Sequence, residues 1–322
     1  MRAVQISEPG GPDALRAVDV DEPRPGEGEV AVAVRAAGVN FVDTYQRSGA
    51  YTLPLPATLG LEGAGEVVEV GPGVTHRAVG DRVAWADALG SYADRVVLRE
   101  ERAVVVPDDL DLDLAAALML QGMTAHYLAY STKHLGRDDT VLVYAPAGGV
   151  GQLLVQLATY RGARVLAATS TDAKERRARE LGAAEVIRYR DVDVAEAVAE
   201  LTDGEGVDVV YDSVGAATFD DSLRCCKPRG LVALYGQSSG PVPPVDPQVL
   251  NRAGSLFLTR PSLAHYAAEA DELHWRATTV LELAHHGKLD VAIHDRYPLE
   301  EAARAHADLE SGTTSGKLLL RP

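Results

Sequence analysis

The chain has 322 residues, of which 46% are hydrophobic and 24% charged, a composition typical of a globular protein with two domains of ordinary size. Its formal net charge of −16 argues against nucleic acid or an anionic membrane surface as a partner. We find no apolar run long enough to cross a bilayer and expect no signal peptide. The two cysteines, Cys225 and Cys226, are adjacent, which favours reduced thiols and a cytoplasmic location over a disulfide framework.

The first 125 residues predict a β-rich domain. Short runs of alternating hydrophobicity at 29–35, 65–70 and 82–85 are separated by Gly/Pro turns. Such alternation indicates antiparallel strands with one face in the core. Around 113–130 the pattern becomes helical, and we interpret this segment as the passage into a second domain.

From about residue 126 to residue 260, predicted strands and helices alternate. After a first βαβ unit, the expected helices are 174–181, 192–201 and 218–226, and the expected strands are 185–188, 207–212, 230–235 and 255–259. This order predicts a doubly wound parallel sheet with right-handed crossovers. The remaining residues, 261–322, contain a predicted helix at 269–286, a short helix from Glu300 and a strand at 317–320, and we expect them to fold back onto the first domain.

The first βαβ unit, at 140–171, carries the clearest functional signal. Its strand is followed by a small-residue turn that includes Gly148, Gly149, Val150 and Gly151, and then by a helix. Such a turn lets backbone N–H groups approach a pyrophosphate, whose charge the helix N-terminus favours. The turn departs from G-x-G-x-x-G, with Pro146 at the first glycine position, and a strand-to-helix turn that binds nothing is the alternative. The strand–helix–strand context favours dinucleotide binding.

Several motifs in order along the whole chain resemble the quinone oxidoreductase (zeta-crystallin) group of the medium-chain dehydrogenases/reductases. They are Gly38–Tyr45, Arg47–Tyr51, Gly60–Gly65, Leu120–Tyr127, Gly148–Gly151, Tyr211–Gly215 and Thr259–Leu263. The resemblance implies a GroES-like catalytic domain at 1–125, completed by 261–322, and a Rossmann NADPH-binding domain at 126–260. It also implies a homodimer, and the strand predicted at 255–259 is able to pair at a sheet edge; a covered edge, which would give the same pattern, is the alternative.

One branch of this family binds zinc, and the sequence departs from that branch. The zinc enzymes have a cysteine near the position of Asn40 and a histidine at the position of Leu61, together with a four-cysteine lobe. Zinc sites require thiolate and imidazole ligands. Two adjacent cysteines and nine scattered histidines do not supply the family's ligand sets. We therefore expect an enzyme that uses no metal.

The end of the second predicted strand of the βαβ unit favours NADPH over NADH. NAD-binding units usually place an acidic residue there, whereas this chain has no carboxylate before Asp172. By resemblance, Ser170, Lys174 and Tyr189 hold the 2′-phosphate, and an ammonium and a phenol suit that group. The alternative is that Lys174 and Tyr189 are ordinary solvated residues. The resemblance also assigns a second set of residues to the cofactor: Gln121, Thr124, Ser213, Tyr235, Ser238 and Arg260.

Hydride transfer from nicotinamide C4 requires alignment and stabilisation of a developing oxyanion, but neither a nucleophile nor a metal. The candidate catalytic residues are Asn40, Tyr45 and Tyr51. A turn role for Asn40 and a loop-covering role for Tyr51 are the alternatives. In related enoyl reductases, the tyrosine that matches Tyr51 resembles a proton donor. Asp43 is expected to cap or brace its loop.

The sequence therefore predicts an NADPH-dependent quinone oxidoreductase with a small-molecule quinone as substrate. An NADPH-dependent reductase of enone or enoyl C=C bonds is the first alternative, because Tyr51 fits both reactions. A non-catalytic NADPH-binding protein is the second alternative, and the presence of Asn40, Tyr45 and Tyr51 together argues against it.

Overall fold

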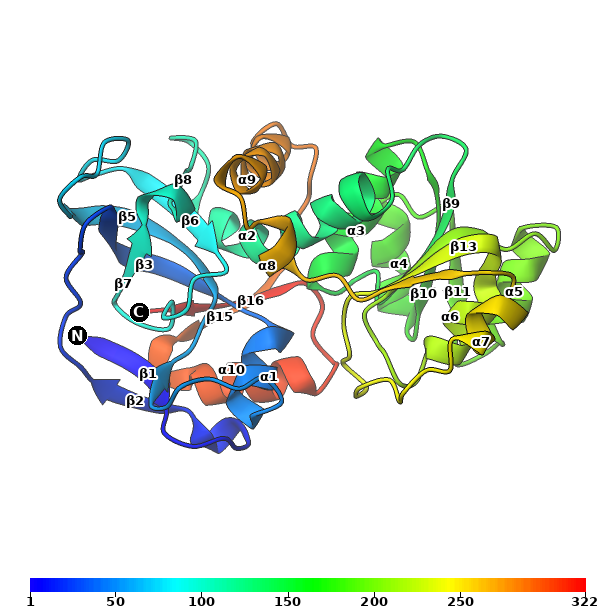
Figure 1. The fold of residues 1–322 in the computed structure, drawn as a ribbon, viewed down its shortest axis with the longest axis horizontal. Coiled ribbons are helices and arrows are strands. Elements are labelled where there is room, and N and C mark those ends of the chain that lie inside the picture. The colour runs from blue at the N-terminus through cyan, green and yellow to red at the C-terminus, as the bar shows by residue number, and fades with distance from the viewer. The chain divides into compact units, whose positions relative to one another are not determined.

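The computed structural model describes all 322 residues, which divide into two compact units. Unit 1 consists of Met1–Met123 and Tyr266–Pro322, and unit 2 consists of Thr124–His265. The chain passes from the first unit to the second within helix α2, Leu112–Tyr127 (Figure 1). None of the helices combines the length and the apolar character needed to cross a membrane.

Unit 1 is built on a seven-stranded sheet whose central strand is β3. Six strands follow the order β15-β16-β3-β5-β6-β8, and β7 also pairs with β3. A second sheet has the order β2-β1-β4. The strands are β1 Arg2–Ile6, β2 Arg16–Asp19, β3 Glu29–Val39, β4 Ala57–Thr58, β5 Glu62–Val70, β6 Arg82–Ala86, β7 Arg95–Arg99, β8 Val104–Val105, β15 Ile293–Pro298 and β16 Lys317–Arg321. The helices that accompany them are α1 Phe41–Ser48, α9 Ala270–His285 and α10 Ala302–Glu310, and the chain returns from unit 2 within the short helix α8, Leu263–Tyr266.

The last strand of the chain lies beside the strand that leads into α1. β16 pairs antiparallel with β3, with Leu318 opposite Val39 and Leu319 opposite Gly38. Leu318 and Leu320 of β16 are buried in a core that also contains Trp85. The pairing brings Lys317, the first residue of β16, close to the start of α1, about 280 residues away in sequence.

Unit 2 contains one six-stranded sheet in which every pair of neighbouring strands is parallel. The order β11-β10-β9-β12-β13-β14 is the 3-2-1-4-5-6 order of a Rossmann fold, so the predicted doubly wound sheet is confirmed (Figure 1). Its strands are β9 Thr140–Tyr144, β10 Arg164–Thr169, β11 Glu185–Arg188, β12 Val207–Asp212, β13 Cys226–Leu234 and β14 Phe257–Thr259. Its helices are α3 Gly149–Tyr160, α4 Asp172–Glu180, α5 Val194–Leu201, α6 Phe219–Cys225 and α7 Gln248–Arg252.

The strand order reverses between β9 and β12, which are neighbours in the sheet. In open parallel sheets, ligands bind at the carboxyl ends of the strands near such a reversal. The loops that leave β9 and β12 are therefore the first places to look for a ligand site in this unit.

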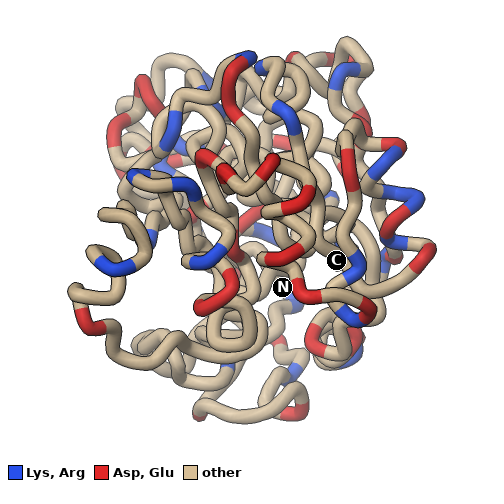
Figure 2. The backbone as a smooth tube through the Cα atoms, turned by 90° about the vertical axis from the view of Figure 1, so that its right-hand side faces the viewer, with Lys and Arg blue, Asp and Glu red and all other residues tan.

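In Figure 2, basic residues lie among acidic ones along the chain, and ion pairs such as that of Arg224 with Asp193 form between them.

Some element boundaries differ from those expected from the sequence. The strand predicted at 255–259 is reduced to Phe257–Thr259, because Gly254 and Ser255 have φ values of 107° and 58°, outside the extended region. The helix expected from residue 192 begins at Val194, where the Asp193 side chain caps the Glu196 N–H. The hydrophobic pattern alone did not indicate α1, α7 or β15.

Candidate cofactor and substrate site

The turn between β9 and α3 presents three unpaired backbone donors. Gly148 is the residue that precedes the helix, and no side chain caps that end. The N–H groups of Gly149, Val150 and Gly151 have no acceptor within the chain, whereas Gln152 N–H already bonds Gly148 O at 2.9 Å. Free first-turn amides at a helix N-terminus attract an anion. The turn therefore has the donor set that a pyrophosphate requires.

The turn is tight enough to require glycine at its last position. A Cβ added at Gly151 would lie 2.1 Å from Ala145 O, which is far inside van der Waals contact. Ala145 itself has a φ of 51°, in the left-handed region that favours glycine. The strained residue of the turn is thus an alanine, and close backbone packing against it fixes the beginning of α3.

Three residues predicted to hold a 2′-phosphate gather at the end of β10. Ser170 follows the strand directly, and Lys174 lies in the first turn of α4, where its N–H bonds Thr171 Oγ1 at 3.3 Å. Tyr189 N–H bonds Thr169 O at 3.1 Å, which brings the tyrosine from the end of β11 to the end of β10. The Tyr189 side chain is 46% exposed and open to a ligand.

A second group of predicted residues lies at the ends of β12 and β13. Ser238 N–H bonds Ser213 O at 3.2 Å, and Tyr235 N–H bonds Asp212 O at 2.8 Å. The Tyr235 hydroxyl is buried and interacts with Ser213 without a hydrogen bond of ordinary geometry. This hydroxyl and Ser213 therefore lie together at the ends of β13 and β12.

The buried Asp212 carboxylate organises the loop that carries Ser213. It accepts hydrogen bonds from the N–H groups of Val214 and Gly215, at 2.7 and 3.0 Å, and from two hydroxyls, those of Thr218 and Ser222. A carboxylate that accepts several bonds at the start of a helix fixes the preceding turn. Arg260, predicted to contact the cofactor, follows the edge strand β14; it is exposed and forms no ion pair within the chain.

In unit 1, the predicted catalytic Asn40 is buried and its amide is fully hydrogen-bonded. Its Nδ2 donates to Glu62 Oε1 at 2.8 Å and to Gly38 O at 3.3 Å. Its Oδ1 accepts from Lys317 Nζ at 2.9 Å and from Gln121 Nε2 at 3.1 Å. Both amide hydrogens and both acceptor positions are therefore used within the chain. Asn40 also caps the N-terminus of α1 and is 3% exposed.

Gln121 and Thr124 lie on α2, and both are buried. The Gln121 amide gives a hydrogen to Asn40, while its Oε1 is buried with no hydrogen-bond partner. Buried acceptors are almost always satisfied, so an orphaned one points to a missing donor. The N–H₂ of a nicotinamide carboxamide is a donor of the required kind.

Tyr45 and Tyr51 form an aromatic pair. Their ring centroids are 5.4 Å apart at 63°, and Tyr51 N–H bonds Tyr45 O at 2.9 Å. Tyr45 lies on α1 and is half-buried, whereas Tyr51 follows the helix and is 41% exposed. Of the three predicted catalytic residues, Tyr51 is thus the most accessible to a substrate.

Behind Asn40 lies a buried ion pair that the sequence did not reveal. Lys317 Nζ contacts Glu62 Oε1, and both side chains are 0% exposed. Glu62 Oε2 also accepts the Leu120 N–H at 2.6 Å. Burial lowers the pKa of Lys317, while the neighbouring Glu62 opposes that shift. The only sequence signal is a lysine at the head of the apolar run 317–320.

A second buried network of hydrogen bonds also braces α1. Asp43 Oδ2 accepts the Asn40 N–H at 2.8 Å, so Asp43 caps the helix as expected, and it accepts the Tyr92 hydroxyl at 2.9 Å. Tyr92 also contacts His306 Nε2 at 3.0 Å, and Arg47 donates to His306 Nδ1 at 3.2 Å. Burial raises the pKa of Asp43 to about 7, and burial together with Arg47 lowers the pKa of His306 to about 3.

No group of three or more His, Cys, Asp or Glu side chains in the chain is arranged to hold a metal ion.

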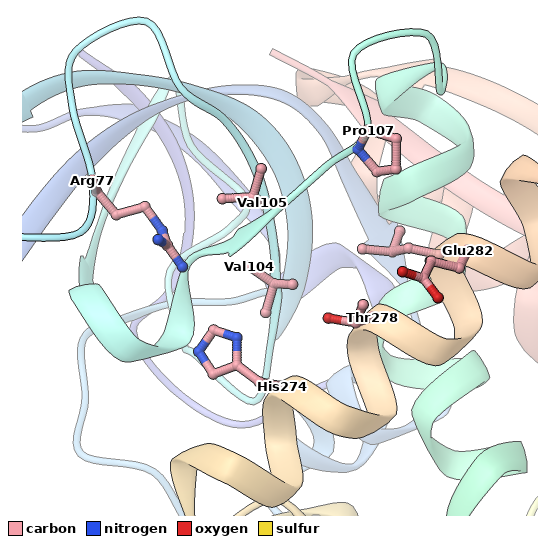
Figure 3. Close-up of a pocket in the computed structure, with 8 residues that line it drawn as sticks. Arg77, Val104, Val105, Pro107, His274, Thr278 and Glu282 are labelled. Carbon is pink, nitrogen blue, oxygen red and sulfur yellow. The ribbon is translucent and has the colours of Figure 1, made fainter.

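Unit 1 also has a hollow of about 320 Å³ between β8 and α9 (Figure 3). Arg77 and His274 are among the side chains that line it, and Val104 lies beside them. The hollow contains none of the predicted site residues.

Comparisons with known proteins agree with this architecture. Residues 26–135 match the family model of the alcohol dehydrogenase GroES-like domain, and residues 149–273 match that of the zinc-binding dehydrogenases. The chain is 45% identical to a quinone oxidoreductase of Pseudomonas aeruginosa, with 100% of this chain and 99% of the relative covered. It is 42% identical to a 2-haloacrylate reductase of a Burkholderia species, over 99% of this chain and 98% of the relative.

Among solved structures, Escherichia coli quinone oxidoreductase complexed with NADPH superposes with a TM-score of 0.98. It is 40% identical, and all of both chains is covered. The two-unit architecture, the six-stranded Rossmann sheet and these full-length similarities lead to one assignment. The chain belongs to the quinone oxidoreductase family of the medium-chain dehydrogenases/reductases.

Proposed function

We propose that the protein is an NADPH-dependent quinone oxidoreductase that works without a metal. The observation that carries this proposal is the turn at Gly148–Gly151, with three unpaired amides aimed from a helix N-terminus. Lys174 carries a positive charge in the first turn of α4, just after β10, and the Asp172 carboxylate in the same turn is paired with Arg188. This arrangement of charges supports a cofactor with a 2′-phosphate. The family supports the reaction class.

Unit 2 supplies the residues that fit NADPH. The amides of Gly149, Val150 and Gly151 would hold the pyrophosphate, and Ser170, Lys174 and Tyr189 the 2′-phosphate. Further cofactor contacts are assigned to Ser213, Tyr235, Ser238 and Arg260, and to Gln121 and Thr124 on α2. The bound cofactor supplies a hydride from its nicotinamide ring.

Unit 1 supplies the residues that act on the substrate. The accessible Tyr51 phenol donates a hydrogen bond to the oxygen of the quinone on which charge develops, and Tyr45 orients Tyr51 through their edge-on contact. Asn40 has no free amide hydrogen, so we assign it the role of fixing α1 and Gln121 rather than donating to the substrate. The Lys317 ammonium occupies the space beside Glu62 and Asn40.

Reduction of an activated C=C bond is the second candidate function. The similarity to a 2-haloacrylate reductase favours it, and a phenol at Tyr51 serves that reaction equally well as a proton donor. The two functions share a cofactor and differ in the acceptor.

We further propose a homodimer that acts in the cytoplasm. Strand β14 is an edge of the parallel sheet, and Phe257 on it is 63% exposed, so a second copy is able to pair there. Both cysteines are free and buried, which suits a reducing compartment. In size-exclusion chromatography we expect the parent to elute as a dimer and a Phe257→Asp variant to elute as a monomer. Identical elution volumes of the two proteins would contradict this interface.

The proposal is tested by titrating the purified protein with NADPH and NADH, and then measuring oxidation of each with 1,4-benzoquinone. We expect tight NADPH binding and fast quinone-dependent oxidation of NADPH, with slower oxidation of NADH. Tight binding of NADPH without turnover of any acceptor would leave a cofactor-binding protein instead of an enzyme. Equal use of NADH would contradict the role given to Lys174.

A further inference from the structure

The first carboxylate after β10, that of Asp172, lies close to the place where NAD-dependent Rossmann domains carry their selectivity residue. Asp172 is the first residue of α4, three positions after the end of β10, and its side chain is 69% exposed. An acidic residue at this strand end accepts hydrogen bonds from the ribose 2′-hydroxyl of NAD and repels a 2′-phosphate. An unpaired Asp172 would therefore oppose the cofactor preference proposed above.

Asp172 is not left unpaired. Arg188, the last residue of β11, stands opposite Thr169 in the register between β11 and β10. Its Nη1 donates to Asp172 Oδ1, and its Nε forms a second ion pair with Asp191 at 2.8 Å. The Arg188 guanidinium thus lies between two carboxylates.

The remaining carboxylate in the first turn of α4 is also paired. Glu175 Oε1 accepts from Nε and Nη2 of Arg179, both at 3.2 Å. Arg190, just after Arg188, forms no ion pair and is exposed. Both acidic residues that follow β10 are therefore paired with arginines, so neither carboxylate faces the strand end without a cation beside it.

We propose that Arg188 determines the preference for NADPH over NADH by holding the Asp172 carboxylate away from the cofactor's 2′ position. Arg188 is a positioning residue in this account, because it acts through Asp172 and not on the phosphate. The inference rests on the proposed NADPH site. It gives Asp172 and Arg188 a role in cofactor selectivity, which the family resemblance did not assign to them.

The experiment measures the dissociation constants of NADPH and NADH from the nicotinamide fluorescence, at low ionic strength and without any acceptor, because exposed charges are screened by salt. Four proteins are compared: the parent, Arg188→Gln, Asp172→Asn and the double variant. Arg179→Gln is the matched control, since it removes an ion pair of the same kind from α4. Circular dichroism checks that each variant is folded.

In Arg188→Gln, the ratio of NADH to NADPH dissociation constants is expected to fall roughly five- to tenfold, as for one charge freed beside a phosphate at a solvated site. Asp172→Asn is expected to keep or raise the parent ratio, and the double variant to recover it. The Arg179→Gln control should leave the ratio unchanged.

Two results would overturn the inference. An unchanged ratio in Arg188→Gln would show that the ion pair has no part in selectivity. A double variant with a ratio as low as Arg188→Gln would show that Arg188 contacts the phosphate directly. A parent protein that binds neither cofactor would instead refute the proposed function, and with it the inference, so the two failures are distinguishable.

Discussion

The Lys317 ammonium and the Glu62 carboxylate form an ion pair from which solvent is excluded on both sides. Both groups also bond the side-chain amide of Asn40, the N-cap residue of α1. A buried pair of this kind adds little net stability over an apolar pair, but removing one partner strands a charge. The pair therefore keeps the amide of Asn40 in one orientation.

Replacing Lys317 with Met tests this relationship. The variant leaves the Glu62 carboxylate buried without its cation, and we expect the free energy of unfolding to fall by about 3–5 kcal/mol. In the double variant Glu62→Gln/Lys317→Met the stranded charge is absent, so at least half of the loss should be recovered. Urea unfolding measures both. Equal stabilities of the single and double variants would show that the charge is not the cause.

The network around Asp43 and His306 predicts two opposing pH effects. His306 has its pKa lowered from 6.5 to about 3, so the stability that its neutral form contributes is lost as pH falls from about 6.5 towards 3. Asp43 has its pKa raised from 3.8 to about 7, so the folded protein loses stability as pH rises from about 4 to 7. Each slope is at most about 1.4 kcal/mol per pH unit, and the two cancel between about pH 4 and 6.5.

Replacing one of these two groups should expose the pH dependence of stability that the other group causes. Relative to the parent, Asp43→Asn is expected to add a positive slope of unfolding free energy against pH over this interval. His306→Gln is expected to add a negative slope. Unfolding curves at half-unit pH steps measure the slopes, and variants whose slopes match that of the parent would contradict the pKa shifts.

The turn before α3 predicts a loss of cofactor binding in Gly151→Ala. The added Cβ would lie 2.1 Å from Ala145 O, so the backbone that presents the three amides must move. We expect NADPH affinity to fall by at least about tenfold, corresponding to 1.4 kcal/mol. Gly136→Ala is the control in the same unit, because its Cβ meets nothing closer than 3.9 Å. Equal affinities in the two variants would argue against the turn as the pyrophosphate site.

The Tyr51 phenol predicts a loss of turnover rather than of cofactor binding. Tyr51→Phe removes the proposed donor but keeps the ring that contacts Tyr45, so we expect kcat to fall roughly ten- to a hundredfold with an unchanged KM for NADPH. Tyr160→Phe, at an exposed tyrosine of unit 2, is the matched control. A Tyr51→Phe enzyme as fast as the parent would remove Tyr51 from the reaction.

The sequence predicted the Rossmann unit closely, because its strands and helices carry periodic apolar patterns and its turn carries glycines. It did not reveal α1, whose eight residues include a buried Asp43 and Arg47 and owe their helix to capping and to contacts with α10. It did not reveal the partner of Glu62 either. Lys317 is 255 residues away in sequence, and only the pairing of β16 with β3 brings the two together. Long-range pairs of this kind leave no local pattern.

The sequence also did not show that Asp172 forms an ion pair. A carboxylate after the second strand of a Rossmann unit indicates NAD when it is read alone, whereas its ion pair with Arg188 depends on the register of β11 against β10. The residues themselves were visible, but the strand alignment that joins them was not.

The most direct test of the proposed function is a competition between two acceptors. Limiting NADPH is supplied to the purified protein with equal concentrations of 1,4-benzoquinone and 2-cyclohexenone, and the products are separated by chromatography, with an enzyme-free reaction as the blank. A quinone oxidoreductase is expected to form hydroquinone and to leave the enone intact. Formation of cyclohexanone as the main product would contradict the account and would assign the protein to C=C reduction.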